Sequence, residues 1–314
     1  MGRVLVIGCV SFDTIHLKHG ENWKTHNTIG GAGLYTALAA AHVGASVTLC
    51  APVILPPTAP VPLQGDTSAL GDPEGGRNQN ANQESVGATL YFVHQRINWT
   101  GVTVNIEDMP GLEIEHCGGG SANLIAARWG KEAYLQPKCL PPIADFDVVH
   151  IAALSSAKRQ MGFANFIADQ RMKTSSQSIV VGARKPLLSI GTYARCIHED
   201  AETVRKLVDM ADCFFMNRNE ANLLFQALPV TPERDQVIFV TDGANGAHIY
   251  TSSRVDQLEP KRAEELDPTG AGDTFCGATL AGIADGEESA VAARAAMELA
   301  AREIEHPGPE YFMK

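Results

Sequence analysis

The chain has 314 residues, of which 45% are hydrophobic, enough for the buried core of one large α/β domain or two small ones. It has 25 Lys and Arg residues against 36 Asp and Glu residues, and its formal net charge of -11 makes nucleic acid and anionic membranes unfavourable partners. The seven cysteines form no C-x-x-C pair, no cleavage-like segment follows the N-terminus, and no apolar run reaches about 18 residues. These features predict a cytoplasmic protein that lacks disulfides and a structural zinc site.

The first 55 residues predict a strand, a helix and a second strand. "RVLVIGCV" (3–10) is a continuous apolar run of strand length, as expected for a strand buried on both faces. A glycine turn and an alanine-rich helix follow in "GGAGLYTALAAAHVGA" (30–45), and "SVTLCAPVIL" (46–55) has the composition of a strand.

The next 80 residues are less regular. Residues 56–85 are rich in Pro, Gly, Asn and Gln, which predicts an irregular insertion or a long surface loop. "VGATLYFV" (86–93), "GVTVNIED" (101–108) and "LEIEHCGGG" (112–120) alternate in the way that suits a small antiparallel accessory sheet. "SANLIAARWG" (121–130) is interpreted as helical.

The second half alternates strands with helical patterns of about ten residues, which indicates βαβ crossovers and a mostly parallel sheet with helices on both faces. Ligands of such sheets bind at the C-terminal ends of the strands. The predicted strands are 147–154, 178–183, 213–217 and 237–243, and the predicted helices are 161–172, 200–211, 219–228, 271–285 and 287–304.

The segment "DPTGAGDTFCGATLAGI" (267–283) places glycines at the start of a predicted helix. Backbone N–H groups in such a turn are exposed and unpaired, and with the helix dipole they favour an anion. A carboxylate is repelled by an anion, so Asp273 is explained best as a general base that takes a proton from an attacking hydroxyl. This pairing suggests phosphoryl transfer, while an ordinary acid at a helix start is the alternative.

"DPTGAGD" resembles the D-T-x-G-A-G-D signature of the PfkB/ribokinase family of carbohydrate and nucleoside kinases, with Pro268 where Thr is common. The resemblance implies that Asp273 is the catalytic base. It implies that the backbone of the G-A-G segment is the anion hole, which comprises Gly270, Ala271 and Gly272. It also implies a monovalent-cation site, with potassium beside Asp267 and Thr269.

The N-terminal glycine segment is similar to the family's first signature, which implies that Gly30 and Gly31 pack close to the substrate. Asp13, in "GCVSFDTI", falls at the substrate-binding Asp of the family. Tyr35 stands where many sugar kinases of the family have an Asn that contacts a substrate hydroxyl. This difference argues against ribose, and the ring could flank a nucleoside base.

Two further segments resemble family elements. "FFMNRNEANLL" is similar to the N-x-x-E element, which implies that Asn217 and Glu220 organise Mg²⁺ and its waters. "VIFVTDGANGAHIY" resembles a T-x-G-x-x-G turn beneath the nucleotide, which gives Thr241, Gly243 and Gly246. Without the resemblance, the first would be a strand-end turn with a helix-start acid, and the second a β-hairpin turn.

The resemblance covers about residues 3–50 and 145–310 and implies one ribokinase-like domain over 1–314. This is an α/β fold with a mostly parallel central sheet, helices on both faces and a small β lid, and we expect the lid and the insertion within 56–135. The expected function is transfer of the γ-phosphoryl group of ATP to a hydroxyl of a sugar or sugar acid. The expected ions are Mg²⁺ and, in addition, potassium.

A nucleoside kinase of the same family, or a member that binds nucleotide or metabolite without turnover, remains the alternative. A P-loop motif and a dinucleotide fingerprint are both missing from the sequence, which disfavours P-loop chemistry and a nicotinamide oxidoreductase. The expected partner is a small-molecule substrate. A homodimer through the accessory sheets is compatible with the sequence, which does not establish it.

Overall fold

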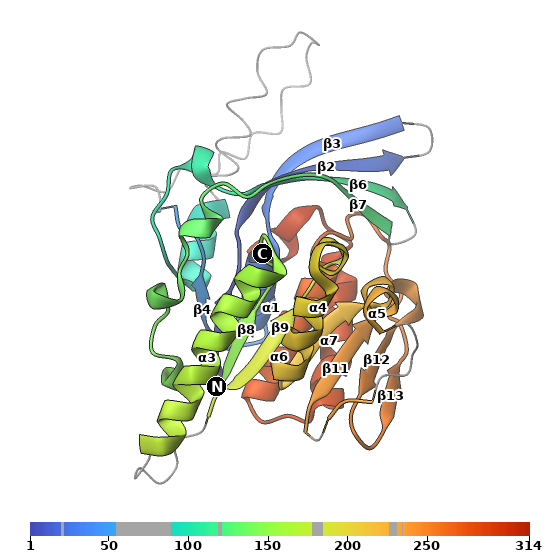
Figure 1. Ribbon diagram of the computed structural model, residues 1–314. Helices are drawn as coiled ribbons and strands as arrows, with labels where there is room; N and C mark the ends of the chain where they lie inside the picture. Colours follow the sequence, from blue (N-terminus) through green and yellow to red (C-terminus); the bar gives the residue numbers. More distant parts are fainter. Residues whose placement is uncertain (20–21, 55–88, 119–120, 178–184, 226–230, 234) are drawn as a thin grey trace.

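A mixed sheet of nine strands forms the body of the protein, in the order β13-β12-β11-β10-β9-β8-β1-β4-β5 (Figure 1). The computed structural model describes residues 1–19, 22–54, 89–118, 121–177, 185–225, 231–233 and 235–314. The strands are β1 (Arg3–Ile7), β4 (Ser46–Cys50), β5 (Asn98–Thr100), β8 (Val148–Ile151), β9 (Leu187–Gly191), β10 (Cys213–Asn217), β11 (Val237–Thr241), β12 (Ala247–Tyr250) and β13 (Val255–Leu258). From β11 to β5 all neighbours are parallel, and β12 and β13 add an antiparallel edge.

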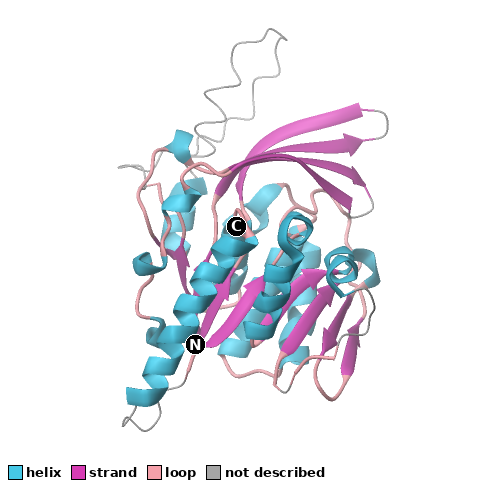
Figure 2. Cartoon of the chain, in the orientation of Figure 1, coloured by secondary structure: helices cyan, strands magenta, loops and turns pink. Residues whose placement is uncertain are grey.

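Helices cover both faces of this sheet (Figure 2). They are α1 (Ala32–His42), α3 (Ala157–Gln177), α4 (Ala194–Met210), α5 (Arg218–Phe225), α6 (Ala271–Ala284) and α7 (Ser289–Glu303). One buried cluster joins the sheet to α1, α6 and α7, and a second joins it to α3, α4 and α5. Among the described helices, none is long and apolar enough to cross a membrane.

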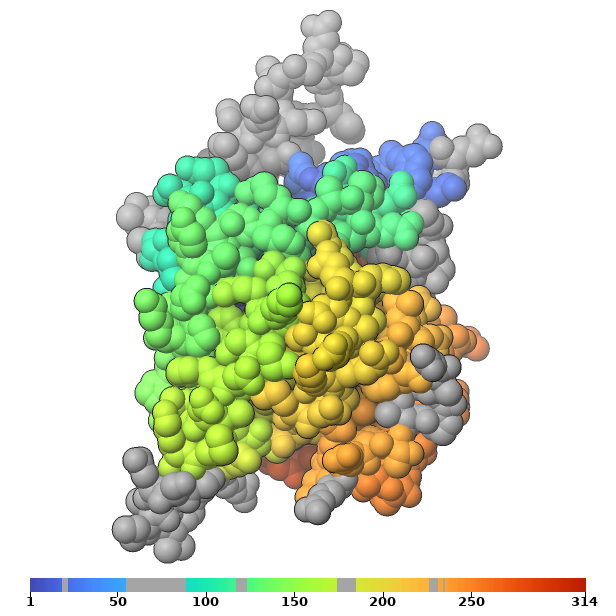
Figure 3. All heavy atoms as spheres, in the orientation of Figure 1, coloured from blue at the N-terminus to red at the C-terminus, as the bar shows by residue number. Residues whose placement is uncertain are grey.

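A second sheet of four strands, the lid, lies over one end of the body (Figures 1 and 3). Its strands are β2 (Ser11–His19), β3 (Asn22–Gly30), β6 (Gly111–Gly118) and β7 (Ser121–Arg128), in the order β3-β2-β6-β7. The two hairpins are antiparallel, and they join through the parallel pair β2 and β6. The expected range 56–135 therefore contains only two of the four strands, because the other two come from 11–30.

Short 3₁₀ turns complete the described elements: η1 (Ile106–Asp108), η2 (Glu132–Tyr134), η3 (Pro137–Cys139), η4 (Ile143–Asp145), η5 (Gly243–Asn245) and η6 (Gly308–Met313). The predicted strand–helix–strand unit at the N-terminus is confirmed by β1, α1 and β4, and the two final helices by α6 and α7. The α/β fold with a mostly parallel sheet is likewise confirmed.

Three predictions for individual segments were wrong. The expected strand 101–108 of the accessory sheet has only an isolated bridge, between Thr103 and Val53, and the turn η1. The expected strand 86–93 is replaced, over its described part, by a helical segment over 89–96, in which Leu90 and Val93 share one buried face at helical spacing, with Ile97 buried just after it. The expected helix 121–130 is the strand β7, whose pairing with β6 overrides its alanine content. The predicted insertion 56–85 and the predicted strand 178–183 lie outside the described residues, and β9 uses "LLSIG" (187–191) instead.

Candidate active site

A cavity of about 340 Å³ opens between the lid and the C-terminal ends of the central strands. The body contributes the last residues of β9, β10 and β11, which are Gly191, Asn217 and Thr241. The lid contributes Leu112 and Ile114 from β6, among others. The cavity thus lies where parallel α/β sheets bind ligands, at the strand C-termini.

The predicted anion hole (Gly270, Ala271 and Gly272), called the anion loop below, forms the start of α6. Gly270 precedes the helix with a φ of 87°, the left-handed region that favours glycine, and no side chain caps the helix. A Cβ on Gly270 would collide with the ring of Tyr35, so only glycine fits against that ring. Gly270 and Gly272 line the cavity, whereas Ala271 does not, and its N–H donates to Pro268 O (3.3 Å).

Asp273 lies in the first turn of α6 and lines the same cavity. Burial raises the pKa of its carboxyl group from 3.8 to about 7. A carboxyl group with a pKa near neutrality is suited to accept a proton from a hydroxyl, since a catalytic base works best when its pKa lies near the working pH.

The glycine pair before α1 is required by close packing around Asp13. A Cβ on Gly30 would collide with the carboxylate of Asp13, and a Cβ on Gly31, whose φ is 100°, would collide with Cys9 O. Asp13 is buried in β2 and accepts a hydrogen bond from Leu112 N at Oδ1 (3.2 Å), while no described group bonds Oδ2. Burial raises the pKa of Asp13 to about 7. Its second oxygen is therefore available to a hydroxyl in the cavity.

Tyr35 is not a free stacking surface. The side chain is 1% exposed, and its ring packs between the backbones of Gly30 and Gly270. Although Tyr35 lines the cavity, the packing shows that its ring supports both glycine turns. The expectation that it flanks a base is therefore not favoured by its position.

Asn217 and Glu220 form a reciprocal cap at the start of α5. Asn217 N and Nδ2 donate to the two carboxylate oxygens of Glu220 (2.8 Å each), and Glu220 N donates to Asn217 Oδ1 (2.9 Å). Both residues line the cavity. Burial raises the pKa of Glu220 to about 7. The pair is thus a structural cap whose carboxylate also faces the cavity, and water-mediated contact with Mg²⁺ is compatible with it.

The segment from Thr241 to Gly246 is a hairpin turn. β11 and β12 pair antiparallel, with Thr241 opposite Ala247, and η5 lies between them. Thr241 lines the cavity, whereas Gly243 and Gly246 do not. The structure therefore brings one of these three predicted nucleotide contacts to the cavity.

Asp267 is fully buried and its carboxylate is occupied by groups of this chain. Thr269 N donates to Oδ1 (3.0 Å) and Gly308 N donates to Oδ2 (2.9 Å). His26 Nε2 lies 3.4 Å from Oδ2, and His116 Nε2 lies 3.6 Å from Oδ1.

The environment of Asp267 does not fit the expected potassium ion. Burial would raise the pKa of Asp267, but the nearby His26 ring and hydrogen bonds from Thr269 and Gly308 outweigh burial and hold the pKa below its ordinary value. The Thr269 hydroxyl is also engaged, in a hydrogen bond with His116 Nε2 (2.7 Å). Asp267 is thus enclosed by groups of this chain and does not line the cavity, and the Thr269 hydroxyl is already bonded, so we derive no step through potassium.

Several cavity residues escaped the sequence analysis. Trp129 and Tyr193 both line the cavity, with ring centroids 6.3 Å apart. His116 lies on the same face of β6 as Leu112 and Ile114. The alternation in "LEIEH" could have indicated that shared face, but not what it covers.

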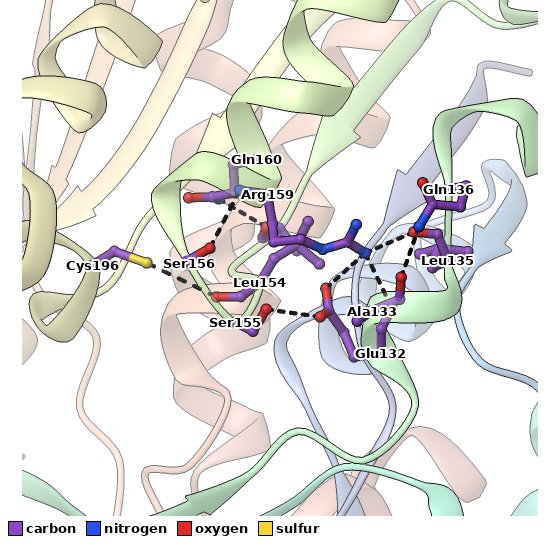
Figure 4. Close-up of polar contacts among 11 residues, drawn as sticks. Glu132, Ala133, Leu135, Gln136, Leu154, Ser155, Ser156, Arg159, Gln160 and Cys196 are labelled. Atoms are coloured by element: carbon purple, nitrogen blue, oxygen red, sulfur yellow. Dashed lines mark hydrogen bonds and ion pairs between the residues drawn. The ribbon is translucent and has the colours of Figure 1, made fainter.

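An ion pair between Arg159 and the buried Glu132 connects the segment that follows β7 to the start of α3 (Figure 4). Glu132 accepts a hydrogen bond from Ser155 Oγ (2.8 Å) and pairs with Arg159 Nη2 (3.5 Å). Arg159 Nη2 also donates to Leu135 O (2.7 Å). Removing one partner would leave a buried charge uncompensated, so the network fixes this junction.

Comparison with known proteins identifies the family. A family model described as pfkB family carbohydrate kinase matches residues 96–314. The chain belongs to the pfkB family. This match confirms the resemblance in the sequence, and it includes β6 and β7, which lie outside the ranges 3–50 and 145–310 that the resemblance covers.

Individual relatives of the pfkB family are distant. Ribokinase of Bacillus subtilis (strain 168) is 29% identical over 106 residues, which are 32% of this chain and 35% of that protein. The match therefore spans about a third of the curated relative.

Solved structures share the fold over nearly the whole chain. A nucleoside kinase of Burkholderia thailandensis, in complex with inosine, has a TM-score of 0.71 at 16% identity over 99% of this chain and 94% of its own. An E. coli protein provisionally assigned as ribokinase II, in complex with ATP and Mg²⁺, has a TM-score of 0.66 at 16% identity over 100% and 96%. The fold is ribokinase-like.

Proposed function

We propose that this protein is an ATP-dependent kinase that transfers the γ-phosphoryl group to a hydroxyl of an uncharged sugar. The observation that carries the proposal is the position of Asp273, whose carboxyl group has a pKa of about 7 and lies in the first turn of an uncapped helix. The cavity thus combines a base with an anion-binding turn, which are the two features that phosphoryl transfer to a hydroxyl requires.

The acceptor binds near Asp13 and reacts near Asp273. The unbonded Oδ2 of Asp13 accepts a hydrogen bond from one hydroxyl of the acceptor. Asp273 takes the proton from the hydroxyl that attacks. The N–H groups of the first turn of α6, around Gly272, stabilise the negative charge of the phosphoryl group in flight.

ATP and Mg²⁺ are assigned to the end of the cavity at Asn217, Glu220 and Thr241. The E. coli relative solved with ATP and Mg²⁺ supports this choice of cofactors. Magnesium bound through water supplies positive charge that offsets the charge of the phosphates. The carboxylate of Glu220 orients that water, and its cap with Asn217 fixes the carboxylate in place.

Charge in the cavity favours a neutral acceptor over a sugar acid. Among the described residues that line it, the acidic and basic side chains other than His are Asp13, Glu220 and Asp273, all carboxylates. An anionic acceptor would have to approach these groups without a compensating Lys or Arg in the described lining. Of the two acceptors expected from sequence, the sugar is therefore favoured over the sugar acid.

A nucleoside is the second candidate, favoured by the aromatic pair Trp129 and Tyr193 at the cavity. Two half-buried rings provide apolar area for a flat base. The structural relative solved with inosine is a nucleoside kinase, which supports the same candidate.

The test is ADP release from Mg-ATP across a panel of sugars, sugar acids and nucleosides. We expect acceptor-dependent release that Asp273→Asn lowers about a thousandfold, the range of general-base catalysis, with ATP affinity retained. Asp285→Asn is the matched control, because Asp285 follows the other end of α6 and pairs with the N-terminus. Near-normal turnover by Asp273→Asn would refute the base assignment. Acceptor-independent ADP release by every variant would refute the proposed transfer.

A further inference from the structure

Two histidines of the lid meet the turn that leads into the anion loop. His116 Nε2, on β6, forms a hydrogen bond with Thr269 Oγ1 (2.7 Å) and lies 3.6 Å from Asp267 Oδ1. His26 Nε2, on β3, lies 3.4 Å from the other oxygen, Oδ2. Two lid strands thus converge on one buried carboxylate. We call these four residues the lid latch: His26, His116, Asp267 and Thr269.

The lid latch is well shielded from water. The side chains of His116 and Asp267 are 3% and 0% exposed, and that of His26 is 22% exposed. Polar contacts in such a setting are stronger than at the surface, and unmaking them leaves buried polar groups unsatisfied. The contact therefore contributes to holding the lid on the body.

The lid latch is directly connected to the anion loop. Thr269 immediately precedes Gly270, and Thr269 N is held by the carboxylate of Asp267. Gly270 in turn rests on Tyr35, so its position has support on one side from α1 and on the other from the latch. If the lid moves away, the hydrogen bond between His116 and Thr269 breaks, and the anion loop keeps only its contact with Tyr35.

We propose that His26 and His116 are positioning residues, which hold the anion loop in its reactive position when the lid is closed over the cavity. The proposal rests on the proposed kinase function for its kinetic consequence. The lid latch couples enclosure of the acceptor to ordering of the anion loop, so that the loop is best ordered when water is excluded from the cavity.

Kinetics of His116→Ala provide the first test. We expect kcat to fall about tenfold to a hundredfold, the cost of a misplaced catalytic group, while the KM for ATP changes little. His116→Gln, whose amide can bond the Thr269 hydroxyl, recovers most of that loss. His16→Gln is the matched lid control, because His16 is bonded to Thr25 and Glu113 on the outer face of the lid and is expected to retain wild-type kcat.

A double-mutant cycle separates positioning from substrate contact. If His116 acts through Thr269, His116→Ala combined with Thr269→Val is no slower than the slower single variant. The proposal would be overturned if the double variant lost kcat by the product of the two single losses. It would also be overturned if only the KM of the acceptor changed. Should His116→Ala fail to fold, Thr269→Val removes the same hydrogen bond from the other side and decides the kinetic question.

Hydrogen exchange of the ligand-free protein tests the coupling without turnover. We expect peptides that cover residues 265–275 to exchange faster in His116→Ala and in His26→Ala than in wild type, and His16→Gln to match wild type. Unchanged exchange in both latch variants would overturn the proposal. Because this measurement needs no reaction, it still decides the matter if phosphoryl transfer itself is refuted.

Discussion

The strands of the body and the strands of the lid differ in how they are buried. β1 and β10 of the body are continuous apolar runs with buried residues along almost their whole length. In the lid, buried and partly buried residues alternate along β2, and Trp23 and Ile125 of other lid strands are exposed, Ile125 to 52%, whereas Leu124 lines the cavity. A sheet covered on both faces is a rigid support, whereas a sheet covered on one face is held by fewer contacts.

The proposed chemistry follows that division. Asp273 and the anion loop belong to the body, on a helix packed against α1 and α7. The walls of the acceptor pocket come in large part from the lid, through Leu112, Ile114 and Trp129 near its last strand. The difference suggests that changes in the body affect the rate of reaction, and that changes in the lid outside the lid latch affect which acceptor binds and how tightly.

The sharpest test of the body is Gly270→Ala. We expect activity to fall at least about a hundredfold and the melting temperature to drop, because the new Cβ meets the ring of Tyr35 and the φ of 87° is strained for alanine. Gly272→Ala is the matched control for stability, since its Cβ meets nothing within 4 Å and helix propensity favours alanine. Equal melting temperatures for the two variants, measured by calorimetry, would contradict this account.

The junction of the two regions is tested by Asp13→Asn and pH. Because the folded pKa of Asp13 is about 7 against an ordinary 3.8, the folded state binds a proton that the unfolded state releases between these values. The free energy of unfolding therefore falls as pH rises through this window, by on the order of 4 kcal/mol at most from this group. The Asn variant should lose less stability between pH 5 and pH 8 in urea unfolding. Identical losses in variant and wild type would refute the assignment.

The lid is tested by Trp129→Leu. We expect the KM of the acceptor to rise about tenfold, the value of lost aromatic contact area, with the KM for ATP nearly unchanged. Tyr134→Leu is the matched control, because Tyr134 is 58% exposed and does not line the cavity. A rise in the KM for ATP that equals the rise for the acceptor would contradict the division between lid and body.

The smallest expected effect concerns monovalent cations. Replacing potassium with sodium or choline at constant ionic strength should change the rate by less than about twofold, because Asp267 and Thr269 are already bonded within the protein. Melting temperatures in the same salts give a readout that is independent of turnover. A clear, selective rise of both quantities in potassium would show that the ion binds here after all.

Local patterns predicted much of the body of this protein, although they missed β5 and β13 and misplaced β9. The strand and helix periods, the glycine turn at Gly270 and the carboxylate three residues later are all encoded within short stretches, since they depend on hydrogen bonds and packing among near neighbours. That is why the α/β alternation and the resemblance to the pfkB family could be seen without coordinates.

The lid and its contacts depended on non-local pairing. β2 and β6 pair in parallel across almost 100 residues, with Leu17 opposite His116, and no local signal in either strand identifies its partner. Together with the β2–β3 hairpin, this pairing brings His26 and His116 to Asp267, and a separate contact puts the Tyr35 ring beside Gly270. Such contacts arise because side chains pack wherever the folded chain brings them together, and residue order alone does not specify those distances.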